Sequence, residues 1–103
     1  MLVLQPGHLY ELKYHNDPHR SVTLYFVKYR KDPDRDGELI LIQDGTTNEE
    51  VLAMLIDRMI HLGTLLPDKY NVDATFHLKE ALKALEARTA DRKARGVEGT
   101  HKP

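Results

Sequence analysis

The chain has 103 residues, of which 41% are hydrophobic and 30% are charged, and its formal net charge is −1. This composition is typical of a globular protein and excludes a disordered or fibrous chain, while the length predicts a single domain. A domain of this size buries only about two thirds of its unfolded surface, so its own core is thin and we expect an oligomer. No apolar run approaches the ~20 residues of a membrane-spanning helix, and the N-terminus lacks the pattern of a secretory signal. We therefore expect a soluble, unexported protein.

Cysteine usage and charge distribution narrow the function further. Cysteine is absent, which excludes a disulfide framework and a thiolate nucleophile and suits a reducing cytoplasm. Residues 87–103 carry five basic and two acidic side chains, whereas residues 46–86 carry four and seven and residues 1–45 carry six and seven. The net charge argues against an attraction of the whole protein to DNA. An anionic partner is instead expected at the C-terminal part of the chain.

The first 45 residues predict an antiparallel β-meander. Three runs have the alternation or the β-branched and aromatic content of strands: "HLYELKY", "SVTLYFVKYR" and "ELILIQD". The turn between the first two contains Pro18, and the next contains Pro33 and an Asp36-Gly37 pair. Three consecutive strands joined by short turns are the simplest arrangement.

The next 50 residues predict two helices. Thr46 or Thr47 is suited to cap the first, with Glu49 or Glu50 completing a capping box. A wide apolar face follows, made of Val51, Leu52, Leu55, Ile56, Met59, Ile60 and Leu62, and it ends toward Gly63 and Pro67.

The second helix is expected to start near Asn71 or Asp73 and carries leucines at helical spacing, at positions 78, 82 and 85. The short connection requires the two helices to be antiparallel. The predicted fold class is therefore α+β: a β-rich segment at 1–45, a helical hairpin at 46–96 and a C-terminal tail at 97–103, within one domain.

Three arginines follow the leucine stripe of the second helix: Arg88, Arg92 and Arg95, at i, i+4 and i+7. The stripe continues through Arg88 or Thr89 and then Arg92, so the face that is apolar in mid-helix becomes cationic near its end. Cations near a helix C-terminus interact favourably with the macrodipole, and Gly96 is a natural residue to end the helix. Guanidinium groups one turn apart also suit neighbouring phosphate oxygens. Helix termination and an anion site both remain open on this pattern.

Other polar residues are weaker candidates. His15, Asp17 and His19 favour a turn over a metal site, because Pro18 interrupts helical spacing and no third ligand is evident. His61 is compatible with a surface or interface imidazole, and Asn71 with a helix N-cap. No nucleophile elbow, phosphate-binding loop or zinc-protease motif is present in the sequence. We expect no enzyme activity, no cofactor and no metal.

Two long motifs, "DGTTNEEVLAMLIDRM" and "LKEALKALEARTADRKARGVEGTHK", together with "LQPGHLYEL", resemble the hairpin-domain family of phage Thoeris anti-defence and anti-CBASS proteins. These are small binders of nucleotide immune signals. The β-rich segment before the hairpin makes the chain more similar to the Thoeris branch than to the all-helical anti-CBASS branch. The resemblance implies a homo-oligomer in the cytoplasm of an infected bacterium. It would sequester glycocyclic ADP-ribose from TIR-domain proteins, and also cyclic di- or trinucleotides, without cleaving them.

The resemblance also implies a ligand site between protomers. Arg88 and Arg92 in "RTADR" match the family's phosphate-gripping arginines, Asn71 matches a polar contact in the connection, and His61 matches an aromatic residue that stacks on the base. Arg95 is expected to add attraction or to brace the following turn. The connection reads "LPDKYN" where many relatives read roughly Phe-Pro-Cys-Arg-Glu-Asn, so ligand preference is expected to differ.

Rival functions make different predictions. The main alternative is a small DNA-binding or transcription-modulating phage protein that uses its basic C-terminal helix, for which binding falls steeply with salt. A hydrolase of the same signals would form product with time through its histidines. A structural interaction protein would bury the arginines against an acidic partner.

Overall fold

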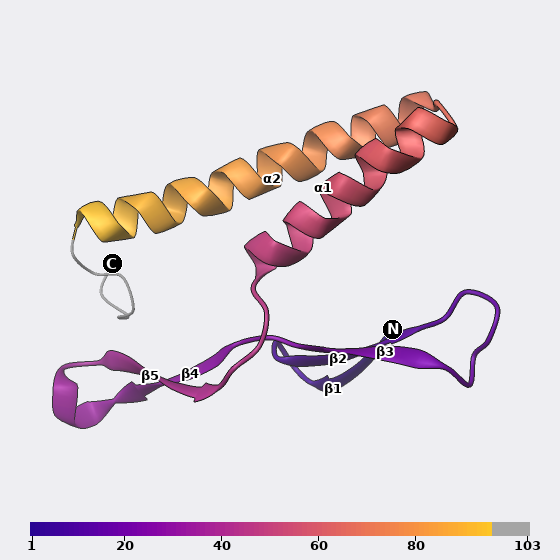
Figure 1. Cartoon of the computed structure of the whole chain (residues 1–103). Helices are drawn as coiled ribbons and strands as arrows, with labels where there is room; N and C mark the ends of the chain where they lie inside the picture. Colours follow the sequence, from indigo (N-terminus) through magenta and orange to yellow (C-terminus); the bar gives the residue numbers. More distant parts are fainter. Residues whose placement is uncertain (96–103) are drawn as a thin grey trace. The chain divides into compact units, whose positions relative to one another are not determined.

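The computed structural model describes residues 1–95, which form two compact units, residues 1–47 and residues 48–95 (Figure 1). The strands of the described chain all lie in the first unit and its two α-helices in the second. This confirms the predicted α+β class, with antiparallel strands followed by a helical hairpin. The predicted end of the hairpin at Gly96 and the tail at 97–103 lie outside the described residues.

The first sheet is a three-stranded antiparallel meander in the order β1 (Leu2–Gln5), β2 (Leu9–Lys13) and β3 (Ser21–Tyr25). Tyr10 pairs with Leu24 and Leu12 with Val22, so these apolar side chains share one face of the pleat. The strand β1 was missing from the sequence prediction. Pro6 and Gly7, whose φ is +79°, form the turn that folds β1 back onto β2.

The predicted strand over residues 21–30 was wrong in one respect, because the structure divides it into β3 and β4 (Lys28–Asp32). The division falls at Phe26 and Val27. The Phe26 N–H donates to the His8 carbonyl at 2.8 Å, whereas the Val27 N–H donates to the Thr46 carbonyl at 3.0 Å. The backbone thus changes its pairing partner at this point, so β4 pairs with β5 (Glu38–Gln43) in a separate two-stranded sheet.

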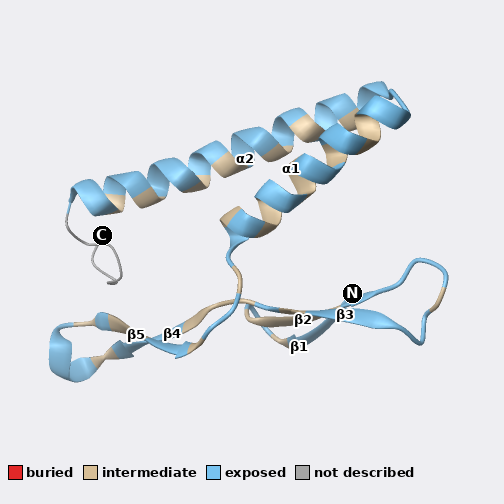
Figure 2. Ribbon diagram, viewed as in Figure 1, coloured by how far each residue is buried: buried red, intermediate tan, exposed pale blue. Residues whose placement is uncertain are grey.

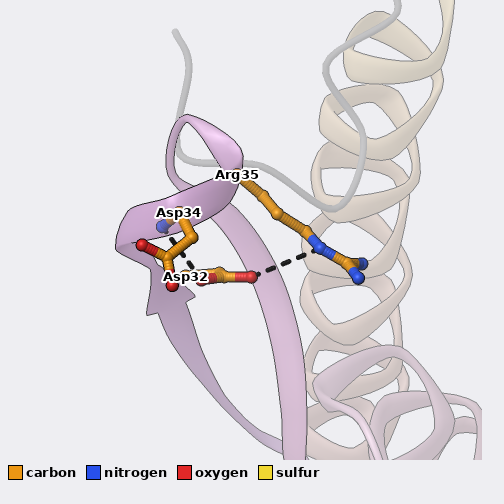
Figure 3. A network of polar contacts seen from close by, with 3 residues as sticks. All are labelled: Asp32, Asp34 and Arg35. Atoms are coloured by element: carbon orange, nitrogen blue, oxygen red, sulfur yellow. Dashed lines mark hydrogen bonds and ion pairs between the residues drawn. The ribbon is translucent and has the colours of Figure 1, made fainter.

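The turn between β4 and β5 contains the short 3-10 helix η1 (Pro33–Arg35) (Figure 3). The Asp32 carboxylate accepts a hydrogen bond from the Asp34 N–H at 3.0 Å and lies 3.5 Å from Arg35 Nε. Asp36 and Gly37 follow with φ of +55° and +79°. Aspartate and glycine tolerate this left-handed backbone, which explains why the predicted Asp36-Gly37 turn forms.

The hairpin consists of α1 (Asn48–Leu65) and α2 (Lys69–Ala94), which are joined by three residues and contact each other (Figure 1). α2 begins earlier than predicted, because its N-cap is Asp68 rather than Asn71. The Asp68 carboxylate accepts from the backbone N–H groups of Tyr70 at 2.7 Å and Asn71 at 3.3 Å. An aspartate directly after Pro67 satisfies the orphan donors of the first turn, which ends the connection sooner than the leucine pattern suggests.

No residue of the described chain is fully buried, as Figure 2 shows by the absence of the buried colour. The facing sides of the helices are half-buried, and they include Leu52, Leu55, Ile56, Leu78, Leu82 and Leu85. Large apolar side chains remain exposed near the connection between the helices, among them Leu66 at 74% and Val72 at 70%. Neither helix of the described residues is apolar enough over a sufficient length to cross a membrane.

Candidate functional site

The hairpin has two chemically different ends. We call the end where α1 begins the open end, and the end with the connection at 66–68 the turn end. α2 has 26 residues and α1 has 18, and eight residues of helix correspond to about 12 Å. The last turns of α2, which carry the arginines, therefore extend past the first turn of α1.

The half-buried stripe of α2 continues into this end through Thr89 and Arg92, whereas Arg88 and Arg95 are exposed. This decides between the two positions that the sequence left open after Leu85. The Thr89 hydroxyl donates to the Leu85 carbonyl at 3.2 Å, so it stays against its own helix. Arg92 is the arginine on the inner face.

Arg88 and Arg95 each have a carboxylate partner. Arg88 Nη2 lies 3.8 Å from Oε1 of Glu49 in the first turn of α1, and Arg95 Nε lies 3.2 Å from Oδ2 of Asp91. The Arg95 N–H also donates to the Asp91 carbonyl at 3.1 Å, and Arg95 is the C-cap of α2. Arg95 thus has the contacts of a helix-terminating residue, while the Arg88 pair links the two helices.

The ion pair of Glu49 and Arg88 also links the two sequence motifs. Glu49 belongs to "DGTTNEEV" and Arg88 to "RTADR". From the sequence, Glu49 was predicted only as a capping residue of the first helix. The position of Glu49 beside α2 could have been predicted from the sequence. In an antiparallel hairpin with a short connection, the start of the first helix lies beside the end of the second helix.

The first residues of the motif "DGTTNEEV" belong to the strand unit, where the structure explains the glycine. A Cβ atom on Gly45 would lie 2.5 Å from the Tyr25 carbonyl oxygen and 2.8 Å from the Phe26 carbonyl carbon. The Gly45 N–H donates to the Asp44 carboxylate at 2.8 Å, and Thr46 forms a bridge with Phe26. The glycine of the motif is thus required by backbone contact.

The turn end holds an apolar groove of about 410 Å³ between the two helices. Its lining includes Met59, Ile60, Val72 and Phe76, together with Asn71 and Lys79. Phe76 is 56% exposed, so an aromatic ring is available at the surface of this groove. The leucine stripe between the helices gives no sign of this groove, whose apolar residues lie outside that stripe.

Within one chain the predicted site residues fall into two groups, with the arginines at the open end and Asn71 and His61 toward the turn end. Asn71 and Arg88 are 17 positions apart on the same helix, which corresponds to about 25 Å. Asn71 lies in the groove of the turn end, whereas Arg88 and Arg92 lie at the open end. His61 is exposed, near the C-terminal end of α1, and its carbonyl accepts from the Thr64 hydroxyl at 2.7 Å.

The described residues contain no group of three or more side chains suited to hold a metal ion. The segment with His15 and His19 forms a turn, in which the Asp17 carboxylate accepts from the His19 N–H at 3.0 Å and the Asp17 carbonyl accepts from the Arg20 N–H at 3.1 Å. The turn interpretation of this segment is confirmed.

Comparison with known proteins adds one relative. Over 59 residues the chain is 42% identical to Thoeris anti-defense 1 of Bacillus phage SBSphiJ7. The match covers 56% of this chain and 42% of the relative, so it spans less than half of the relative's length. No family model and no solved structure matches the chain. The chain is thus a distant relative of Thoeris anti-defense 1, which confirms the resemblance indicated by its motifs.

Proposed function

We propose that this chain counters Thoeris immunity in phage-infected bacteria by binding a cyclic nucleotide signal and holding it without cleavage. The observation that carries the proposal is the 42% identity to Thoeris anti-defense 1. Glycocyclic ADP-ribose is the proposed signal, and cyclic di- or trinucleotides, which would extend the activity to CBASS, are further candidates. Capture of this kind needs slow release of the ligand and no catalytic group.

The proposed contacts follow from the chemistry of the side chains. Arg92 and Arg88 would pair with phosphate oxygens through charge-assisted hydrogen bonds, which are stronger than neutral ones. Asn71 would donate to a ribose or base edge, and His61 would stack on the base. Arg95 would contribute attraction at longer range, because its guanidinium already contacts Asp91 in the same helix.

The separation of these residues supports a ligand pocket shared between copies of the chain. The roughly 25 Å between Asn71 and Arg88 is too long for one small nucleotide to touch both in the same chain. If two hairpins associate antiparallel, the turn end of one copy meets the open end of the other. The exposed apolar groove at the turn end supports such an assembly, because burying it against a second copy removes apolar surface from water.

The test is a ligand-retention experiment. The purified protein is incubated with glycocyclic ADP-ribose isomers and a panel of cyclic di- and trinucleotides, isolated by size exclusion, and heat-denatured so that the released compound can be identified. Release of intact ligand, near one per pocket, is the expected result. A degraded product would indicate an enzyme. Absence of any retained ligand would contradict the proposal, and binding to duplex DNA that weakens steeply with salt would then favour the DNA-binding alternative.

A further inference from the structure

We infer that Glu49 is a specificity-determining residue, which disfavours nucleotides that carry a terminal phosphate at the open end of the hairpin. The inference rests on the proposed function, since it concerns which nucleotides Arg88 and Arg92 accept. It adds a residue that the motif resemblance did not place at the site and assigns it a chemical task.

The position of Glu49 is the first observation. Its Oε1 atom lies 3.8 Å from Arg88 Nη2, and its side chain is 31% exposed. Glu49 also lines a shallow depression together with Glu86, Thr89 and Lys93. A carboxylate therefore lies directly beside a guanidinium that is proposed to receive phosphate, and any anion that approaches Arg88 also approaches Glu49.

The ion pair has little structural importance. The Arg88 side chain is 58% exposed, and exposed ion pairs contribute little to folding because water screens them and both side chains lose rotamer freedom. The contact with Glu49 involves the Arg88 Nη2 atom, at 3.8 Å. The guanidinium is a planar fork of several donors, so donors remain for a phosphate while the Glu49 carboxylate stays in place.

The balance of charges at the open end also disfavours ligands with additional negative charge. In the described part of this end, the basic side chains are Arg88, Arg92, Lys93 and Arg95, and the acidic ones are Glu49, Glu50, Glu86 and Asp91. The two sets are equal in number, so the end does not attract anions by net charge alone. Binding must then depend on directed hydrogen bonds, and each additional negative charge on a ligand is opposed by the carboxylates.

The charge of a phosphate group decides which ligands the carboxylates disfavour. A phosphate esterified on both sides carries one negative charge, whereas a terminal phosphate carries about −1.5 to −2 at neutral pH. One charge near Arg88 at a partly exposed site changes affinity by about threefold to tenfold per additional ligand charge. A signal with only internal phosphates avoids this penalty, while ADP incurs it.

ADP and ADP-ribose are suitable probes, because they share adenosine and a pyrophosphate and differ in whether the terminal phosphate is esterified. Both are used as competitors, up to tens of millimolar, against bound glycocyclic ADP-ribose. The proteins are the unmodified chain, Glu49→Gln, and the control Glu80→Gln. Glu80 lies eight residues before Arg88, about 12 Å along α2 and beyond the screening length at physiological salt. Like Glu49, Glu80 has a basic partner, Lys83, at 3.4 Å.

The expected result is that Glu49→Gln improves competition by ADP relative to ADP-ribose by about threefold to tenfold, while Glu80→Gln leaves the ratio unchanged. The ratio cancels any general loss of affinity caused by a displaced Arg88. An equal ratio in Glu49→Gln and the unmodified chain, or exclusion of ADP from both, would overturn the inference while leaving the proposed function intact. Failure of the unmodified chain to hold glycocyclic ADP-ribose would overturn both.

Discussion

The open end and the turn end of the hairpin are built from the same two helices but differ in chemistry. The open end has arginines and carboxylates at close distance, with the pair of Arg88 and Glu49 between the helices. The turn end has an apolar groove with Phe76 exposed beside it. Charged side chains suit contact with the phosphates of an anion, and exposed apolar area suits contact with a second copy. Substitutions at the two ends should therefore fail in different ways.

The largest expected effect is at the open end. Arg92→Ala should lower retention of the nucleotide signal by about 100-fold or more, because it removes a charge-assisted contact from the half-buried face of α2. Isothermal titration or competition binding measures the effect. The matched control is Arg95→Ala, whose guanidinium contacts Asp91 in its own helix and whose loss should change affinity by less than about threefold. Unchanged binding by an assembled Arg92→Ala protein would remove Arg92 from the site.

At the turn end the expected failure is loss of assembly. Phe76→Glu introduces a charge into the apolar groove, and it should raise the dissociation constant between copies by about tenfold or more. Light scattering coupled to size exclusion gives the mass. Ala81→Glu, at an exposed position of α2 outside the groove, serves as the control. Equal masses for the two variants across a dilution series would show that the groove is not an interface between copies.

A smaller effect is expected on the folding of the turn end. Asp68→Ala removes the N-cap of α2 and should cost about 1 kcal/mol, which lowers the melting temperature by roughly 4–8 °C. Thermal unfolding followed by circular dichroism measures this. Asp73→Ala, which loses only an exposed contact with His77, should shift the melting temperature by much less. Equal shifts would indicate that capping by Asp68 is not what starts the helix at residue 69.

The smallest effect concerns the stability of the open end. Glu49→Gln should change the free energy of unfolding by less than about 0.5 kcal/mol, because its partner Arg88 is largely exposed. Denaturant unfolding measures the difference. A loss of more than about 1 kcal/mol would identify the ion pair as structural.

The periodicity of apolar residues was sufficient to predict the helices and the α+β class. The spacing of leucines along α2 predicted its inner face, and the turn signals at Pro33 and Asp36-Gly37 predicted the β4–β5 turn. Helix and turn signals are local in sequence, since they depend on neighbours within about four residues. Local signals of this kind can be recognised in the sequence without knowledge of the tertiary fold.

Pairing between segments that are distant in sequence was harder to predict. The division of the predicted strand at Phe26 depends on hydrogen bonds to His8 and, through Val27, to Thr46. Neither partner is near in sequence, and β-branched and aromatic residues continue across the division. The same reason explains why Gly45 was not recognised as a contact glycine, since the Tyr25 backbone that excludes a Cβ lies 20 positions away.

The sequence proposed the residues of the candidate site but not their arrangement. The arginine spacing left helix termination and an anion site open, and the motif resemblance supplied Asn71 and His61. The structure adds that these residues lie toward opposite ends of the hairpin. Helix length produces this result, because 17 residues of α-helix span about 25 Å whatever their sequence.

The central claim is that each ligand pocket combines the turn end of one copy with the open end of another, and a mixing experiment tests it most directly. Asn71→Ala and Arg92→Ala chains, each inactive alone, are co-expressed or refolded together and assayed for retention of glycocyclic ADP-ribose. If each pocket takes Asn71 from one copy and Arg92 from the other, random mixing should restore about one quarter of the unmodified capacity. No recovery in a correctly assembled mixture would contradict a pocket shared in this way.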